Sequence, residues 1–429
     1  MKIDVLVCGG GCAGLGAALG AAREGAKVLL VERAPFAGGI VTAVGLPFMD
    51  GFACWHTGRL VVKGIALRLC ERLGLAHPGA KQIEEIKTAV GGLTRHGSIA
   101  LFNIDEFKLA ADDALNEGGV RVLFHAVACE TEVRTGRIEA VRVATKQGLL
   151  RIEPQVVIDA SGDADVAAFS NCPLDPNPQR MPMTMHFRVG NVRYQPQTRT
   201  LAREAVKAAH EKGELPHYYG PGLCDAFAKD EAYVHAVRVP GDAIDPFDLT
   251  RAEMQGRRDA WTMWQVWKRE VPGFEESYFI GSGPYIGVRE TRRIAGAHVL
   301  SGEEIRARTD FDDAIATGSW YTDLHPNKAT EGSAHPKEEK VVPPQPYDIP
   351  YRSIVARGVE NLLVAGRCHS ADRVAASSTR VTVTAMALGE AAGCAAALSV
   401  RSKQPVAALN GVQVRERLAA QGGGPFTYA

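Results

Sequence analysis

The pattern of apolar and polar positions near the N-terminus predicts a βαβ unit. Residues 3–7 form a largely β-branched apolar run, which is typical of a buried parallel strand. A glycine-rich turn follows, then the alanine-rich segment 15–24 with helical composition, and then a second apolar run over residues 27–31. This order of strand, turn, helix and strand predicts an α/β fold with a parallel sheet.

The turn between the first strand and the helix has the spacing Gly9-x-Gly11-x-x-Gly14. The first glycine of such a fingerprint allows a tight turn, the second lets backbone approach a pyrophosphate, and the third brings the helix close to the strand. Glu32 ends the second strand, where an acid that binds a ribose hydroxyl belongs. A carboxylate there would repel a 2′-phosphate, so the fingerprint favours FAD or NAD over NADP.

The loop after the second strand separates FAD from NAD. It carries the pair Gly38-Gly39 within residues 33–40. In large flavoproteins such a pair lets the backbone lie along the ribityl and pyrophosphate portion of FAD, whereas a simple NAD dehydrogenase usually proceeds to another helix. The loop therefore favours FAD.

Later segments return to the same parallel sheet. The pattern predicts a helix over 103–117, a strand over 120–124, a hairpin around 135–137 and a strand over 156–159 that ends in Ala160-Ser161-Gly162. A further strand over 361–364 runs into Gly366-Arg367, followed by a polar cluster at 377–380 and a small-residue helix over 383–398. Small residues at the carboxyl ends of parallel strands lie where cofactors bind. An ordinary turn and an ordinary capped helix account for the same local patterns.

The composition of the chain limits the kinds of partner that we expect it to bind. The chain has 429 residues, and its Lys+Arg and Asp+Glu counts are both 49, so no global basic field favours nucleic acid or anionic lipid, and we expect a small-molecule partner. The nine cysteines include no C-x-x-C pair, which argues against a zinc site and a redox disulfide and favours a reducing compartment. No group of His, Asp and Glu has metal-ligand spacing, so no metal is expected. Neither a signal peptide nor a membrane span is evident, so we expect a cytoplasmic protein.

Four blocks of the chain resemble the FAD-dependent oxidoreductases related to the fumarate-reductase flavoproteins. The blocks are residues 4–40, 102–165, 281–296 and 347–393, with 157–165 and 347–353 especially similar to the family pattern. The resemblance implies a Rossmann-type FAD-binding domain, with a central parallel sheet and a β-hairpin layer, plus an inserted α+β substrate domain. We place the FAD domain at 1–165 and 336–429 and the substrate domain at 166–335.

The fingerprint and the resemblance together imply a set of cofactor contacts. We expect FAD to lie against Gly9, Gly11, Cys12, Ala13, Gly14, Glu32, Arg33, Gly38, Gly39, Ile40, Val127, Ala160, Ser161, Gly162, Gly366, Arg367, Ser378, Arg380, Val381 and Thr384.

Three residues are candidates for catalysis. Arg289 lies in a block that resembles the family's segment near the isoalloxazine, where a cation stabilises anionic reduced flavin or binds a carboxylate. His325 lies in a loop that resembles the substrate side of the flavin, and an ordinary histidine pKa near neutrality suits proton transfer there. His56 follows the glycine-pair loop and is a candidate for a position near the flavin or for covalent attachment. A surface charge cluster and a structural histidine account equally well for the patterns around Arg289 and His325.

The region 166–335 carries two further patterns. Residues 183–189 alternate as a strand with methionines on one face, and Trp261, Trp264 and Trp267 recur every three residues on a predicted helix. Both patterns favour core packing, and the tryptophans alternatively form a wall for a flat substrate.

The expected reaction is hydride transfer between a small organic substrate and flavin N5. Two alternatives stay open: monooxygenation of an aromatic compound, and a flavin that is structural or acts as a sensor. The pattern leaves open the electron donor or acceptor, while the long apolar C-terminal helix is compatible with a homodimer.

Overall fold

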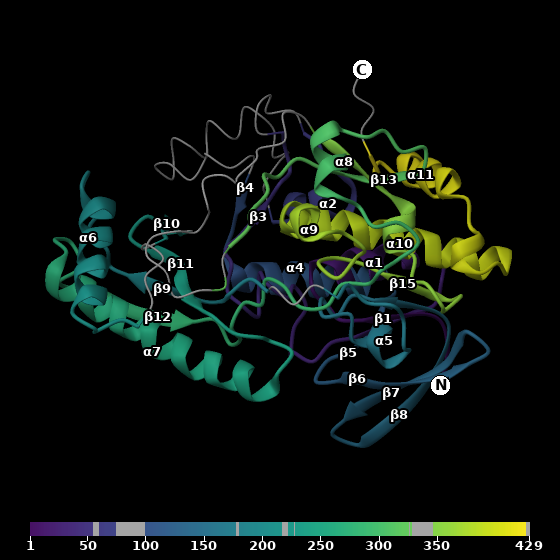
Figure 1. Ribbon diagram of the computed structural model, residues 1–429, viewed down its shortest axis with the longest axis horizontal. Coiled ribbons are helices and arrows are strands. Elements are labelled where there is room, and N and C mark those ends of the chain that lie inside the picture. The colour runs from purple at the N-terminus through teal and green to yellow at the C-terminus, as the bar shows by residue number, and fades with distance from the viewer. Residues whose placement is uncertain are drawn as a thin grey trace.

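The computed structural model describes residues 1–54, 60–73, 99–176, 180–216, 222–226, 228–325, 327 and 346–425. Its central sheet has the parallel order β5-β2-β1-β8, with β15 parallel to the carboxyl half of β8 (Figure 1). The strands are β1 (Lys2–Cys8), β2 (Val28–Val31), β5 (Arg121–Leu123), β8 (Gly148–Asp159) and β15 (Leu362–Val364). The predicted βαβ unit is confirmed, with α1 (Cys12–Arg23) between β1 and β2.

An antiparallel meander extends this sheet. It consists of β6 (Val127–Arg134), β7 (Arg137–Thr145) and the amino half of β8. The predicted hairpin turn lies between β6 and β7, where Thr135 and Gly136 both have positive φ. β8 has 12 residues because it serves both layers, pairing first with β7 and then with β1 and β15.

A second sheet lies at the other end of the molecule (Figure 1). Its order is β10-β11-β9-β12, with bounds Leu223–Asp225, Ala232–Val239, Met183–Gly190 and Tyr278–Ser282. α7 (Pro246–Glu270) packs on this sheet, and α6 (Thr198–Glu211) packs on α7. Trp264 and Trp267 are buried, with Trp267 stacked on Phe187 and Trp264 tilted against Phe279, so these two are core residues. Trp261 is half exposed and does not belong to the core.

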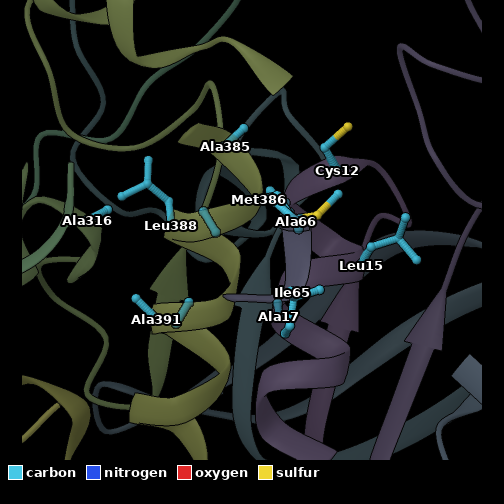
Figure 2. Close-up of a cluster of buried hydrophobic side chains, with 14 of the residues drawn as sticks. Cys12, Leu15, Ala17, Ile65, Ala66, Ala316, Ala385, Met386, Leu388 and Ala391 are labelled. Carbon is cyan, nitrogen blue, oxygen red and sulfur yellow. The ribbon is translucent and has the colours of Figure 1, made fainter. Parts of the chain in front are cut away.

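Two helices cross in direct backbone contact at the centre of the molecule. They are α1 and α10 (Thr382–Ser402), and Figure 2 shows small side chains of both, including Ala17 and Ala391, in one buried cluster. A Cβ on Gly389 would lie 1.9 Å from the carbonyl oxygen of Ala13, so only glycine allows this approach. α10 is long and apolar enough to span a membrane, but 83% of its most apolar window is buried inside the fold.

The remaining elements lie around the two sheets and α10, and several of them contact α10 directly. They are β3 (Phe48–Asp50), α2 (Gly64–Arg72), β4 (Ile99–Leu101), α4 (Ile104–Glu117), α5 (Asp165–Phe169), α8 (Gly302–Ala307), β13 (Ala314–Gly318), β14 (Tyr347–Pro350), α9 (Arg373–Thr379) and α11 (Gly411–Ala420), with 3-10 turns at Tyr351–Ile354 and Val406–Ala408. The polar cluster at 377–380, predicted as a cap before α10, instead forms the end of α9. Asp372 caps α9 by accepting from the backbone N–H of Ala375 at 2.7 Å, which starts the helix before the cluster.

Glu390 ties α10 to its neighbours. Its carboxylate is almost fully buried, pairs with Arg23 of α1 and accepts from the backbone N–H of Ile65 at 2.9 Å. Removing one member of a buried ion pair leaves the other charge without its partner. We expect Glu390→Ala to lower the free energy of unfolding by about 3 kcal/mol, measured by urea denaturation.

The matched control is the exposed pair Arg137–Glu360, whose N–O distance is 3.0 Å. Glu360→Ala should cost less than about 1 kcal/mol because solvent screens this pair. Equal losses of unfolding free energy in the two variants would show that burial adds nothing to the contribution of the Glu390–Arg23 pair.

Candidate functional site

A groove of about 190 Å³ opens at the carboxyl ends of the parallel strands. Gly11, Cys12 and Ala13 line it, at the N-terminus of α1, and that helix has no side-chain cap. The first N–H groups of a helix have no partner inside it, and the helix dipole places positive charge there. The groove therefore presents donors for an anion such as a pyrophosphate.

Glu32 lies where β2 ends, at one end of the groove. Its carboxylate accepts from the backbone N–H of Gly10 at 2.5 Å and of Ala34 at 2.8 Å. It borders the groove and an adjoining pocket of about 80 Å³, which Val127 and Ala128 of β6 also line. This arrangement places an acid between the N-terminus of α1 and a small recess lined by both apolar and charged residues, where an acid of a dinucleotide fold binds a ribose.

The N-terminus of α10 meets the opposite part of the groove. Thr382 and Ala385 line the groove there. Asp50 accepts from the Thr382 hydroxyl at 2.7 Å, and burial raises the pKa of this aspartate. The Thr384 hydroxyl is buried and has no hydrogen-bond partner among the described residues. Partial positive charge at this helix end suits a group that becomes anionic on reduction.

A cavity of about 300 Å³ adjoins the groove on the side of the second sheet. Ile40, Arg289, Arg380 and Thr382 border both spaces. The cavity is further lined by Leu46, Phe48, Asp50, His186, Arg199, Leu223, Cys224, Tyr233, His235, Trp320, Tyr321, Asp323 and Val381. A mostly apolar cavity with a few convergent polar groups is the usual form of a small-molecule site.

Arg289 is a half-buried cation at the junction of the groove and the cavity. Desolvation, and then repulsion by Arg238 and Arg380, lower its pKa to about 9. It stays protonated at neutral pH. Its guanidinium donates a long hydrogen bond of 3.5 Å to the carbonyl oxygen of Pro182. Arg289 therefore places a positive charge at the junction, where it would stabilise an anionic group.

Asp323 connects two of the sequence candidates. Its carboxylate accepts from Arg380 at 2.7 Å and lies 3.1 Å from Nε2 of His325. His325 is buried, does not line the cavity, and has its pKa lowered well below the ordinary value by desolvation. The expectation that His325 titrates near neutrality is therefore wrong, because a sequence pattern does not reveal desolvation.

Histidines that the sequence did not single out form one wall of the cavity. His186 of β9 and Tyr233 of β11 share a hydrogen bond of 2.7 Å between Tyr233 Oη and His186 Nδ1. His235 stacks on Tyr233, and its Nδ1 lies 3.6 Å from Cys224 Sγ. Strand alternation held the missed signal, because His186 is on the face opposite the methionines at 183 and 185 that pack in the core.

Most of the sequence-predicted cofactor residues come together. Those that line the groove are Gly9, Gly11, Cys12, Ala13, Glu32, Arg33, Gly39, Ile40, Ala160, Ser161, Gly162, Gly366, Arg367 and Arg380. Val127 lines the adjoining pocket, and Val381 lines the cavity. Gly14, Gly38, Ser378 and Thr384 do not line the groove. Ser378 is instead buried on α9, where its hydroxyl donates to the carbonyl oxygen of Trp320. His56 lies outside the described residues.

The groove has a further wall that the residue-by-residue prediction missed. Tyr285, Ile286, Gly287 and Val288 line it, and the guanidinium of Arg33 lies 5.3 Å from the centre of the Tyr285 ring. The signal for this wall was the resemblance of residues 281–296 to the family. A Cβ on Gly287 would lie 2.9 Å from the side chain of Val44, so glycine allows close packing there. Backbone donors at the N-terminus of α1, a carboxylate at the end of β2 and the N-terminus of α10 in one groove fit a flavin dinucleotide.

Comparisons with known proteins agree with this geometry. The family model described as FAD dependent oxidoreductase matches residues 4–418. The comparison with curated proteins gave no match.

Similar solved structures include three proteins at low sequence identity. A geranylgeranyl bacteriochlorophyll reductase-like protein from Thermoplasma acidophilum is 13% identical with a TM-score of 0.47, covering 98% of this chain and 84% of that one. p-Nitrophenol 4-monooxygenase PnpA from Pseudomonas putida is 12% identical with a TM-score of 0.47, covering 97% and 84%. The flavin-dependent brominase Bmp2 is 14% identical with a TM-score of 0.46, covering 95% and 81%.

Proposed function

The chain belongs to the FAD dependent oxidoreductase family, and from this premise we propose that it transfers hydride between a small organic substrate in the cavity and flavin in the groove. The observation that carries the proposal is the shared border of the two spaces, formed by Ile40, Arg289, Arg380 and Thr382. FAD, when bound, supplies a two-electron carrier that accepts or donates hydride at N5. Under the same proposal, residues 1–165 and 336–429 hold FAD, while 166–335 hold the substrate.

The residues of the junction have separate tasks in this proposal. Arg289 places positive charge beside the reacting groups. Asp323 holds Arg380 in place, and His325 acts through Asp323 as a positioning residue. Leu46, Phe48 and Trp320 are apolar walls of the cavity that limit its contact with bulk water.

Anaerobic reduction of the FAD-loaded protein tests the proposal. Purified protein is mixed without oxygen with a panel of reduced organic compounds, and the flavin absorbance is followed. Bleaching by a compound identifies a substrate that is oxidised. If none bleaches the flavin, chemically reduced protein is mixed with activated alkenes and carbonyl compounds, and reoxidation identifies a substrate that is reduced.

Two results would replace this proposal. Incorporation of an oxygen atom from air into an aromatic compound, with reductant consumed, would identify a monooxygenase. A flavin that neither direction of the screen bleaches or reoxidises would indicate a structural or sensing FAD.

Filling the cavity tests where the substrate lies. Cys224 is half-buried and lines the cavity but not the groove. We expect Cys224→Phe to keep its full FAD content and to lower the rate of flavin reduction at least tenfold, because the new ring occupies the substrate space. Stopped-flow absorbance without oxygen measures this rate.

Cys224→Ser is the matched control, since it preserves the volume of the side chain and should react at nearly the wild-type rate. Unchanged reduction in Cys224→Phe would show that the substrate does not use this cavity.

A further inference from the structure

The cavity wall contains a buried tyrosine whose hydroxyl has one described acceptor. Tyr233 is fully buried, and its hydroxyl lies 2.7 Å from Nδ1 of His186. No other hydrogen-bond partner of this hydroxyl is present among the described residues. A buried O–H group requires an acceptor. The hydroxyl therefore donates to Nδ1 of His186.

This hydrogen bond determines which ring nitrogen of His186 carries the proton. A neutral imidazole has one N–H, and when Nδ1 accepts, the proton is on Nε2. Burial lowers the pKa of His186 well below the ordinary histidine value, and the neighbouring His235 and Arg289 lower it further, so the ring is neutral. Burial raises the pKa of Tyr233, so the phenol keeps its proton.

Nε2 of His186 lies beside the wall that separates the groove from the cavity. A Cβ built on Gly287 would lie 3.6 Å from this nitrogen, and Gly287 lines the groove. His186 itself lines the cavity. Arg289, two residues after Gly287, borders both spaces. His186 and Arg289 therefore line the same cavity, and Arg289 is near enough to lower the pKa of His186.

We propose that His186 is a catalytic residue that donates from Nε2 to a substrate oxygen, with Arg289 as the second stabilising group, and that Tyr233 positions it. This inference rests on the proposed function. It assigns the substrate to compounds whose reacting carbon is bonded or conjugated to an oxygen, such as carbonyl compounds, enones or the matching alcohols.

The electron balance explains why such an oxygen is needed. When a hydride adds to a carbonyl carbon, a C–H bond forms with the hydride pair, and the C=O π pair moves to the oxygen. The alkoxide then takes a proton from water, and the oxidation of an alcohol runs through the same steps in reverse. A neutral N–H and a guanidinium stabilise the negative charge without having to lose a proton.

An oxyanion probe tests the inference without turnover. The FAD-loaded, oxidised protein is titrated with 4-hydroxyacetophenone over a range of pH, and difference absorbance reports how much of the bound probe is phenolate. We expect the wild-type protein to prefer the phenolate at least tenfold over the phenol, which lowers the pKa of the bound probe by about one unit.

Variants separate the donor from its positioning residue. His186→Leu should lose the phenolate preference, whereas His186→Gln should keep most of it because the amide N–H replaces Nε2–H. Tyr233→Phe should give an intermediate loss, since the histidine proton is then free to move to Nδ1. His298→Gln, at a histidine outside both spaces, should match the wild type. Flavin content and thermal melting show whether each variant is folded. If His186→Leu does not fold, the phenolate preferences of His186→Gln and Tyr233→Phe test the inference.

Three results overturn the inference. They are no binding of the probe to the wild type, binding of the probe as the neutral phenol, or a phenolate preference in His186→Leu and Tyr233→Phe that equals that of the wild type. Each is distinguishable from failure of the proposed function, because the anaerobic screen reports flavin redox chemistry independently of this equilibrium titration.

Discussion

The Gly14→Val variant should purify without FAD. A Cβ on Gly14 would lie 1.8 Å from the carbonyl oxygen of Gly9, and because this oxygen belongs to the backbone it cannot rotate away. α1 must then move off β1, and the N–H groups of the groove move with it. We expect at least a 100-fold loss of FAD affinity, measured as flavin absorbance after purification and by titration of the apoprotein with FAD.

Gly281→Ala is the matched control, because a Cβ at that glycine meets nothing within 4 Å. It should retain FAD fully. Stoichiometric FAD in Gly14→Val would contradict the assignment of the groove, since the helix would then tolerate displacement without loss of the cofactor site.

Replacing Arg289 by methionine should slow flavin reduction by about 100- to 1000-fold while the protein keeps its FAD. Methionine preserves much of the side-chain volume but removes the cation at the junction of groove and cavity. The groups that we propose to hold the pyrophosphate and the ribose lie elsewhere in the groove, at α1 and Glu32. Anaerobic stopped-flow absorbance measures the rate, with the substrate that the screen identifies.

Arg289→Lys should recover part of the rate, because it restores the charge without the planar donors of the guanidinium. A methionine variant as fast as the wild type would remove Arg289 from the chemistry and leave it a structural cation.

The dinucleotide fold was predictable because its signals are local. The turn at Gly9 and the acid at Glu32 follow from backbone geometry within one βαβ unit. Strand alternation likewise predicted the core face of β9, and the three-residue spacing of the tryptophans predicted that α7 buries Trp264 and Trp267. The resemblance to the family assigned the distant segments around Gly366 and α10 to the same domain as this unit. Residue spacing alone does not show that they belong together.

The cavity was not predictable in the same way, because its wall joins residues far apart in the sequence. His186 meets Tyr233 only when β9 pairs with β11. His325 has ordinary loop neighbours in the sequence, yet burial beside Asp323 removes it from the cavity and lowers its pKa. Burial and long-range pairing are properties of the assembled fold, so the local pattern favoured the wrong histidine environment.

The central claim is that hydride moves between a substrate in the cavity and flavin in the groove. Anaerobic stopped-flow reduction with a substrate that carries deuterium at its reacting carbon tests it most directly. We expect a primary isotope effect on flavin bleaching in the wild type and a much slower reaction in Cys224→Phe. Bleaching with no isotope effect and at the same rate in both proteins would contradict it.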